Sequence, residues 1–579
     1  MAGQVNRGRV VKMEVTDVRS APARALAEAL REAAIAIGAP DDFSPQVERP
    51  ADPTHGDFAS NAALVLSGRL GRPPRELAAE LAEHLDLAST GVSDLAIAGP
   101  GFLNFSLSED VLWAGLRSAL ESGADWGRSS AAEPLRYNVE FVSANPTGPL
   151  HVAHGRGAAI GDATAALLEW TGHEVKREFY VNDAGRQIEL LGESIETRWL
   201  QARGADLEMP QGGYQGEYIR DIAEELAGEL GDARLEALER PERLNLLSAK
   251  ATDILRAGQA RDLDAFGVHM DHWFDESSLF ATGGVDGLLD RLTESGRAYR
   301  DDGAVWLRTT DLGDEKDRVL VKSDGSHTYF VSDIAYHLDK AERDFQRAID
   351  VWGADHHGHV PRMQAALTAL GLGEDFLEVL LIQLVTVMRG GEEVRMSKRA
   401  GQFVSLRDLF AETGPDVARY FFLMRRAEVP MAFDLDLALD TSDANPVYKV
   451  QYAHARMCSV FRRGEVDPES LAPTDADLAA LGPGTERMVL MTVLRFPERV
   501  RAAARARAPY QVCNYLEELA GAVNAWYHEG NLDASRRLLA EGPSRPGRLA
   551  LARAVQLTLG SGLKLLGISA PERLEREGE

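Results

Sequence analysis

The sequence predicts a multidomain α/β protein in which a small α+β domain comes first, a parallel-sheet domain follows, and an all-α bundle ends the chain. Three observations support this prediction. The chain has 579 residues, whereas a single hydrophobic core stops growing near roughly 250–300 residues. Strand and helix patterns alternate through the middle of the chain, and strand patterns disappear after about residue 436. Apolar residues make up 45% of the chain, which excludes wholesale disorder.

The beginning of the chain is expected to hold a short tail, residues 1–12, and an α+β domain, residues 13–125. An alanine- and leucine-rich stretch at 21–38 predicts its first helix. Two alternating apolar runs at 92–98 and 102–108 are separated by Gly-Pro-Gly, so they predict two short strands joined by a turn.

The next part, residues 126–440, is expected to form the parallel-sheet domain. A predicted strand at 136–144, a helix at 151–172 and a second strand at 173–183 make up a strand–helix–strand unit. Such units are typical of parallel sheets. Charged amphipathic helices at about 186–265 are interpreted as an insertion into this domain.

Further strands are predicted beyond the insertion, where β-branched and aromatic residues are frequent. The runs TYFVSDIAYHL (328–338) and LEVLLIQLVTVM (377–388) are two of them, and the second is expected to be one buried strand. Residues 441–579 show only helical patterns and are predicted to form the helical bundle.

Charge and cysteine content narrow the class of protein. The net charge of −27 argues against a surface coated with nucleic acid, because phosphate binding needs local positive charge. The excess of acidic residues lies before residue 441, however. Residues 441–579 are nearly neutral and contain many arginines, so this part could still bind a polynucleotide along one face. Cys458 and Cys513 are the only cysteines, so we expect neither a disulfide framework nor a thiolate zinc site.

Targeting and membrane signals are not evident in the sequence. The longest apolar runs are far shorter than the roughly 18 residues that span a membrane. The first residues, MAGQVNRGRVVKMEV, lack the apolar core of a signal peptide. We therefore expect a cytoplasmic protein without a membrane partner.

The stretch PLHVAHGRGAA, residues 149–159, suggests a binding site. His151 and His154 share one face at the start of a predicted helix that follows a strand, where free N–H groups bind anions. The glycines that follow would let a nucleotide or a neighbouring strand approach closely. Metal ligation and burial in a core are the alternatives, although no third ligand is evident nearby.

A second basic motif, VRMSKRAG at residues 394–401, follows a flexible Arg-Gly-Gly-Glu-Glu stretch. A lysine and two arginines on a glycine-flanked loop are suited to clamping phosphates. An exposed basic turn is the simpler interpretation when this motif is considered alone.

Together these motifs resemble the two ATP signatures of class I aminoacyl-tRNA synthetases, HIGH and KMSKS, and the surrounding residues resemble the arginyl-tRNA synthetase family in particular. The second signature comes about 240 residues after the first. The resemblance extends over nearly the whole chain. The segments that carry it are VEFVSANPTGPLHVAHGRGAAIGD, FYVNDAGRQI, GGYQGEYI, TYFVSDIAYHLDK, VWGADHHGH, MSKRAGQFVSLRDL and NPVYKVQYAHAR.

The resemblance implies a Rossmann-type catalytic domain that makes arginyl-adenylate from L-arginine and ATP, releases pyrophosphate, and passes arginine to the terminal adenosine of its tRNA. It implies His151, His154 and Lys398 as catalytic residues that stabilise phosphate charge. Mg²⁺ is expected to arrive with ATP, without a tightly bound metal or organic cofactor, and the protein is expected to be a monomer. The implied ATP-binding residues are His151, Ala153, His154, Gly155, Arg395, Met396, Ser397 and Lys398.

Selection of arginine requires carboxylates that match a planar guanidinium group. The family's pattern gives Asp333 and Glu276 as candidates for that group and Asn145 as the candidate for the α-amino group. The full set of expected arginine-binding residues is Glu140, Asn145, Glu276, Tyr329, Asp333, Asp355 and His356. The Asp-His-His-Gly-His run at 355–359 could also suit a metal on residue types alone, but the family places that loop over the amino acid and adenine.

Two regions are expected to contact tRNA. The family places its N-terminal domain at the outer corner of the tRNA and its C-terminal bundle at the anticodon, where unstacked bases can stack on aromatic side chains. Phe105 is expected to belong to the core instead. The expected contact residues are Phe102, Asn104, Tyr448, Tyr452, His454 and Arg456.

The sequence departs from the family's pattern at four positions. Alanine replaces a signature glycine at 153, and we expect its methyl group to be tolerated. Arg395 and Arg399 replace a lysine and a serine, and Lys449 replaces a tyrosine. Another class I synthetase, an adenylylating nucleotidyltransferase, and an inactive RNA-binding relative are the alternative functions.

Overall fold

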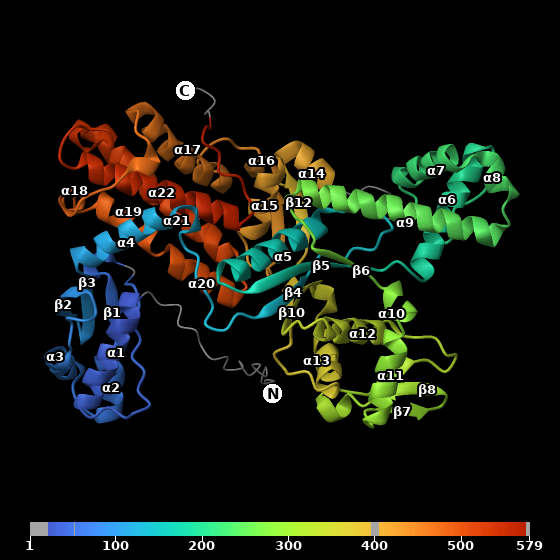
Figure 1. Cartoon of the computed structure of the whole chain (residues 1–579), viewed down its shortest axis with the longest axis horizontal. Helices are drawn as coiled ribbons and strands as arrows, with labels where there is room; N and C mark the ends of the chain where they lie inside the picture. The colour runs from blue at the N-terminus through green and yellow to red at the C-terminus, as the bar shows by residue number, and fades with distance from the viewer. Residues whose placement is uncertain (1–20, 51, 395–404, 575–579) are drawn as a thin grey trace. The chain divides into compact units, whose positions relative to one another are not determined.

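The computed structural model describes residues 21–50, 52–394 and 405–574 (Figure 1). These residues form two compact units, and several C-terminal helices contribute to both. The first unit comprises the chain up to Gly127 with Val460–Ala502 and Gly521–Thr558, and the second comprises Arg128–Ser459, Ala503–Ala520 and the residues from Leu559 onward.

The first unit contains a three-stranded antiparallel sheet with the order β1-β3-β2. The expected first helix and the two strands joined by a turn are confirmed. Helix α4 was not predicted from the sequence. The Ser108 hydroxyl caps its N-terminus and accepts a hydrogen bond from the backbone N–H of Val111. The bounds are α1 Ala21–Ala36, β1 Phe58–Ser60, α2 Ala62–Leu70, α3 Pro74–His84, β2 Val92–Ala98, β3 Phe102–Leu107 and α4 Glu109–Ser122.

The C-terminal part is helical, as expected. In the part of the chain that the structure describes, the last strand is β14, Met431–Asp434. The helices after it are α16 Leu435–Ala438, α17 Pro446–Gly464, α18 Asp475–Ala479, α19 Thr485–Leu494, α20 Phe496–Ala506, α21 Tyr510–Leu532 and α22 Arg545–Leu565. Within the described ranges, no helix is both long enough and apolar enough to cross a membrane.

A five-stranded parallel sheet lies at the centre of the second unit, with the order β11-β10-β4-β5-β6. The predicted strand–helix–strand unit is confirmed as β4, α5 and β5. Gly161 brings α5 against the sheet, because a methyl group there would lie 2.2 Å from the Phe141 ring. The bounds are β4 Arg136–Glu140, α5 Val152–Trp170, β5 Glu174–Val181, β6 His272–Asp275, β10 Arg347–Gly353 and β11 Leu377–Ile382.

The insertion consists of four helices that pack against one another (green in Figure 1). They have a hydrophobic core of their own, which includes Leu191, Trp199, Ile219, Leu226 and Leu247. The bounds are α6 Arg186–Ala202, α7 Glu217–Leu230, α8 Asp232–Ala237 and α9 Arg240–Ala265.

Two strand predictions beyond the insertion were wrong. Residues 328–338 begin α12, a helix that buries Val331, Ile334 and Leu338 at helical spacing. Residues 377–388 form two strands instead of one, because β11 belongs to the parallel sheet whereas β12 pairs with β14 in another sheet.

The remaining elements complete the second unit. A small antiparallel sheet, β7-β8-β9, shares a hydrophobic core with α12. The bounds are α10 Ser277–Ala281, α11 Gly284–Glu294, β7 Ala298–Asp301, β8 Ala304–Leu307, β9 Arg318–Val321, α12 Tyr329–Glu342, α13 Val360–Ala369, β12 Val385–Arg389, β13 Glu392–Glu393, α14 Leu406–Thr413 and α15 Pro415–Leu423.

Candidate active site

The carboxyl end of β4 has an unusual backbone. Val142 and Ser143, just beyond the last residue of the strand, have φ angles of +71° and +41°. A left-handed conformation is costly for a β-branched residue and is typical of functional sites. The Ser143 hydroxyl donates to the Glu140 carboxylate at 2.8 Å and accepts the backbone N–H of Tyr180 at 3.2 Å. The turn therefore fixes Glu140 at the strand end, where ligands bind in parallel sheets.

The two histidines of the first signature lie together where α5 begins. The backbone N–H of His151 donates to Nδ1 of His154 at 3.2 Å, and the ring centroids are 3.7 Å apart. Their spacing of three residues predicts this proximity. Ala153, which lies between the two histidines in the sequence, is half-buried. The first turn of a helix presents positive partial charge, so both rings are suitably placed beside a bound phosphate.

The glycines after the histidines provide room for protein packing. A methyl group at Gly155 would lie 2.5 Å from a side-chain carbon of Leu406 and 3.0 Å from the Phe422 ring. At Gly157 it would lie 3.3 Å from Ile382. On this side of α5, neighbouring protein elements therefore occupy the space that the sequence analysis left open to a nucleotide or a strand.

The chain after the second signature returns directly to the first. Ser405 forms an antiparallel bridge with His151, and the backbone N–H of Leu406 donates to the carbonyl of Leu150 at 2.9 Å. The expected ATP-binding residues Arg395, Met396, Ser397 and Lys398 lie outside the described residues, as does Arg399. Ser405 and Leu406, which follow the second signature in the sequence, thus lie beside the first signature at the point where α14 begins.

Three of the predicted arginine-binding residues surround one tyrosine. Burial raises the pKa of Tyr180, and the carboxylates of Glu276, Asp333 and Glu140 raise it further. Glu276 is itself buried, and burial raises its pKa. Hydrogen bonds from Ser332 and Tyr180 lower this pKa, whereas the nearby Asp333 raises it, and the net change is an increase. Glu140, Glu276 and Asp333 thus form an acidic cluster near Tyr180, although they come from β4, the start of α10 and α12.

Asp333 lies on a helix, whereas the sequence predicts a strand for TYFVSDIAYHL. It lies in the second turn of α12, and its carboxylate is 2.9 Å from Nε2 of His359. Tyr329, one turn earlier, is 72% exposed. Asn145, Asp355 and His356 are also exposed, Asn145 after the β4 turn and the other two after β10.

A buried lysine next to this acidic cluster was not predicted. The Lys340 ammonium group donates to Glu140 at 2.9 Å and to Asp350 at 2.8 Å. His337 contacts the second oxygen of Asp350 at 2.7 Å. No signal in the sequence marks these contacts, because Lys340 and Glu140 are 200 residues apart.

The insertion holds the turn that leads into the first signature. The buried Gln259 of α9 donates to the carbonyls of Asn145 and Gly148 at 3.1 Å and 3.0 Å. Tyr218 of α7 donates to the carbonyl of Thr147 at 2.9 Å. The insertion therefore has a structural role at the site, which the sequence alone does not indicate.

Family models and relatives support one assignment. The chain matches a model described as "Arginyl tRNA synthetase N terminal domain" over residues 23–107, one described as "tRNA synthetases class I (R), catalytic domain" over 116–422, and one described as "DALR anticodon binding domain" over 450–574. An arginine–tRNA ligase of Bacillus licheniformis is 45% identical over 553 residues, which cover 95% of this chain and 98% of that protein. The chain belongs to the arginyl-tRNA synthetase family.

Further members of the arginyl-tRNA synthetase family are similar over a comparable length. An arginine–tRNA ligase of Thiobacillus denitrificans is 47% identical, and the match covers 94% of this chain and 98% of that protein. The solved arginyl-tRNA synthetase of Thermus thermophilus superposes with a TM-score of 0.74 at 25% identity, covering 95% of this chain and all of that one. The family resemblance that the sequence motifs indicate is thereby confirmed.

The tRNA-contact residues expected of an arginyl-tRNA synthetase differ in accessibility. Phe102 is 41% exposed at the start of β3, Asn104 is half-buried, and Phe105 lies in the core as expected. Tyr448 and His454 are buried on α17, and Nδ1 of His454 is 2.9 Å from the carbonyl of Pro571.

Tyr452 and Arg456 are more accessible and lie one turn apart on α17. The Tyr448 and Tyr452 rings stack with their centroids 5.8 Å apart, and the Arg456 guanidinium lies 4.6 Å above the Tyr452 ring. A half-buried aromatic ring with an arginine above it is suited to stacking on an unpaired base.

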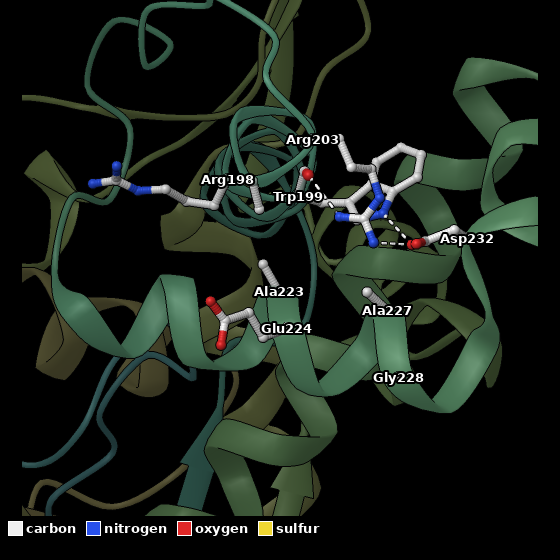
Figure 2. A pocket seen from close by; sticks show the side chains of 9 residues that line it. Arg198, Trp199, Arg203, Ala223, Glu224, Ala227, Gly228 and Asp232 are labelled. Atoms are coloured by element: carbon white, nitrogen blue, oxygen red, sulfur yellow. Dashed lines mark hydrogen bonds and ion pairs between the residues drawn. The ribbon is translucent and has the colours of Figure 1, made fainter.

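A cleft of about 480 Å³ lies between the helices of the insertion (Figure 2). Trp199 donates from its indole N–H to the carboxylate of Asp232 at 3.0 Å, and Arg203 also pairs with Asp232. The lining residues are Arg198, Trp199, Ala202, Arg203, Ala223, Glu224, Ala227, Gly228 and Asp232. None of them belongs to the acidic cluster or to the two synthetase signatures.

Groups of three or more histidine, cysteine, aspartate or glutamate side chains that could hold a metal ion are absent among the described residues. The Asp-His-His-Gly-His run forms no such group. Its His359 contacts Asp333, whereas Asp355 and His356 are exposed.

A buried charge cluster links the first signature helix to the end of the chain. Asp162 of α5 accepts from Arg177 of β5 at 2.7 Å and from Arg419 of α15. Arg419 also donates to the carbonyls of Leu566 at 2.5 Å and Phe266 at 3.2 Å. Five segments of the chain therefore meet at Asp162 and Arg419.

Asp162→Asn is expected to lower the free energy of unfolding by about 3–5 kcal/mol, because both arginines would lose a buried charged partner. Denaturant unfolding at neutral pH measures this loss. Glu169→Gln is a matched control, since Glu169 also pairs with Arg177 but its side chain is 40% exposed. An equal loss in both variants would contradict the importance of burial at Asp162.

The stabilisation by Asp162 should depend on pH. Burial alone would raise the pKa of Asp162, but Arg419 and Arg177 outweigh it and hold the pKa below its ordinary value. Because the pKa of Asp162 is lower in the folded protein than in the unfolded chain, its charge stabilises the folded protein at pH values above the unfolded pKa of about 3.9. This stabilisation is lost as the pH falls through the folded-state pKa. The difference between wild type and Asp162→Asn should therefore shrink in acid.

Proposed function

We propose that this arginyl-tRNA synthetase binds L-arginine in a pocket lined by the acidic cluster, here called the acidic pocket, and uses it with the two signatures to charge tRNA in two steps. In the first step, a carboxylate oxygen of arginine bonds to the α-phosphorus of ATP, and pyrophosphate leaves. In the second step, a hydroxyl of the terminal adenosine of the tRNA attacks the arginyl carbonyl, and AMP leaves. The observation that supports this most is the gathering of Glu140, Glu276 and Asp333 at the strand end that leads into His151.

The phosphate chemistry is assigned to the start of α5 and to the second signature. His151 and His154 stabilise the charge that builds on the α-phosphate, and Lys398 holds the departing pyrophosphate with help from Arg395. Mg²⁺ enters bound to ATP as part of the substrate. The adenine lies against the backbone near Ala153.

The arginine side chain is assigned to the acidic pocket. Asp333 and Glu276 receive the guanidinium group, since carboxylates match its planar fork of donors. Asn145 binds the α-amino group, and Tyr329 forms a wall of the pocket. The loop that carries Asp355 and His356 covers the amino acid and the adenine.

The tRNA is assigned to the two domains that precede and follow the catalytic domain, 126–440, in the sequence. The domain at 13–125 contacts the outer corner of the tRNA through Phe102 and Asn104. The helical domain at 441–579 contacts the anticodon through Tyr452 and Arg456, because Tyr448 and His454 are buried. We propose a monomer that works in the cytoplasm, where charged tRNA is used.

Aminoacylation of total tRNA with labelled arginine tests this function. Arginyl-tRNA should form only when arginine, ATP and tRNA are all present, and parallel assays with each other amino acid should give no product. Charging with another amino acid would favour a different class I synthetase. Tight tRNA binding without any charging would indicate an inactive RNA-binding relative, and the proposed function would be wrong.

A further inference from the structure

Three carboxylates lie in one row across the centre of the parallel sheet. Glu140 of β4 is in register with Asp350 of β10 on one side and with Glu178 of β5 on the other. Side chains at the same level of neighbouring parallel strands point to the same face. All three are buried, and Asp350 and Glu178 have no exposed surface. We call Glu140, Asp350 and Glu178 the carboxylate row.

Helix α12 and Arg343, the residue directly after it, bring the groups that face this row. Lys340 contacts Glu140 and Asp350, and Arg343 contacts both oxygens of Glu178 at 2.6 Å and 2.9 Å. Tyr336 donates to Glu178 at 2.7 Å, and His337 contacts Asp350 at 2.7 Å. Glu178 and Asp350 thus each have a second partner on α12.

Glu140 depends on Lys340 far more than the other two carboxylates do. Its other hydrogen-bond donor is the Ser143 hydroxyl, which is neutral. Lys340 is fully buried, and its ammonium group lies 4.3 Å from the centre of the Tyr336 ring in addition to its two carboxylates. Two hydrogen bonds and a ring face use the three directions in which an ammonium group can donate.

A purely structural role is a weak explanation for this arrangement. A buried ion pair adds little to stability compared with well-packed apolar residues, because both charges must leave water. The pair nevertheless lies at the last residue of β4, directly before the strained turn at Val142 and Ser143. Glu140 is also one of the carboxylates around Tyr180.

We propose that Lys340 is a positioning residue for arginine, which holds Glu140 as an oriented carboxylate so that the pocket presents its negative charge to the cationic substrate. This inference rests on the proposed function. Lys340 itself is buried beneath Glu140 and does not need to contact arginine. Its ammonium group compensates Asp350 as well, so that two carboxylates can remain charged side by side.

The charge state of Glu140 should therefore change when Lys340 is removed. Burial already raises the pKa of Glu140, Lys340 opposes that effect, and Asp350 adds to it. Without Lys340, the groups left around Glu140 are Asp350, Ser143, Tyr180, Tyr336 and His337. Glu178 and Arg343 lie one strand away, and Glu276 and Asp333 are the other carboxylates near Tyr180. Two close carboxylates then share a proton near neutral pH.

Lys340→Met keeps the length of the side chain and removes its charge. We expect KM for arginine to rise roughly 10- to 100-fold near neutral pH, while KM for ATP stays within about twofold. The arginine KM of the variant should fall as the pH is raised toward about 9, because Glu140 ionises again. The wild type should show much less change. Aminoacylation rates at varied arginine and varied ATP measure these values.

A double variant distinguishes charge from packing. In Lys340→Met with Asp350→Asn, the like charge beside Glu140 is also absent, so KM for arginine should recover to within several-fold of the wild type. Lost packing cannot be restored by a second deletion. If Lys340→Met alone does not fold, the double variant is compared directly with the wild type, and a folded double variant with a high arginine KM would overturn the inference.

Arg548→Met is the matched control, because it breaks another buried ion pair, Arg548–Glu486 at 2.6 Å, in the first unit. It should lower thermal stability and leave the arginine KM unchanged. An unchanged arginine KM in Lys340→Met, or equal effects in the control, would sink the role of Lys340. Absence of arginine charging by the wild type would instead refute the proposed function.

Discussion

Asp333→Ala is expected to raise KM for arginine roughly 10²-fold and to leave KM for ATP nearly unchanged. The variant removes a carboxylate that faces the guanidinium group in the proposed complex, and a lost charge-assisted hydrogen bond to a buried group has this magnitude. Aminoacylation measured with arginine varied at saturating ATP, and then the reverse, separates the two constants. Equal changes in KM for arginine and KM for ATP would show that Asp333 does not bind the arginine side chain.

Two further variants sharpen this experiment. His359→Phe removes the partner that lies 2.9 Å from Asp333, so it shows whether Asp333 acts only by orienting His359. Glu342→Ala removes an exposed acid from the last residue of the same helix and should change neither constant. If His359→Phe reproduced the whole effect of Asp333→Ala, direct recognition by Asp333 would be contradicted.

Lys398→Ala is expected to slow adenylate formation roughly 10²-fold or more, the scale of a lost transition-state contact. The lysine is proposed to hold the pyrophosphate as it leaves, so the loss should fall mainly on the rate and less on KM for arginine. Single-turnover formation of arginyl-adenylate, followed with tRNA present, measures the chemical step. A rate near that of the wild type would assign the clamping to Arg395 and Arg399.

Lys398→Arg serves as the charge-conserving control. Arginine keeps the positive charge but presents a planar fork in place of a compact ammonium group. Partial recovery relative to Lys398→Ala would support a charge contact with phosphate. Recovery to the full wild-type rate would mean that the loop needs only positive charge at this position.

The order of domains could be predicted from the sequence because it rests on local patterns. The β4–α5–β5 unit follows from alternation and helical spacing within a few dozen residues. The failures have longer-range causes. TYFVSDIAYHL is rich in β-branched and aromatic residues, yet it becomes α12 because Val331, Ile334 and Leu338 pack on one core.

The prediction of a single strand at 377–388 was wrong for a related reason. Its residues suit a strand throughout, but the carbonyl of Gln383 accepts a hydrogen bond from the buried Arg156 of α5 at 2.8 Å. Arg156 also donates to the carbonyls of Arg426 and Val429 at 2.8 Å and 3.0 Å. Burial lowers the pKa of Arg156 to about 10. The break between β11 and β12 thus coincides with a contact 227 residues away in sequence.

The sequence predicts those residues of the candidate site that belong to recognisable family motifs. Glu140, Glu276 and Asp333 were expected from a family pattern, and the structure brings them around Tyr180. The residues behind them, including Lys340 and Asp350, were not expected, because a lone lysine in a helix is usually a surface residue. Only the register of the strands shows that Asp350 lies beside Glu140.

The cluster at Asp162 also constrains how the chain is made. The buried guanidinium of Arg419 needs the carbonyl of Leu566, which lies 147 residues later in the sequence. At about 5–20 residues per second on the ribosome, that partner is synthesised roughly 7–30 s after Arg419. During this interval the Arg419 guanidinium lacks the hydrogen bond to the Leu566 carbonyl that it makes in the core of the complete second unit. Release of a prematurely terminated chain should therefore yield a protein that does not complete its folding.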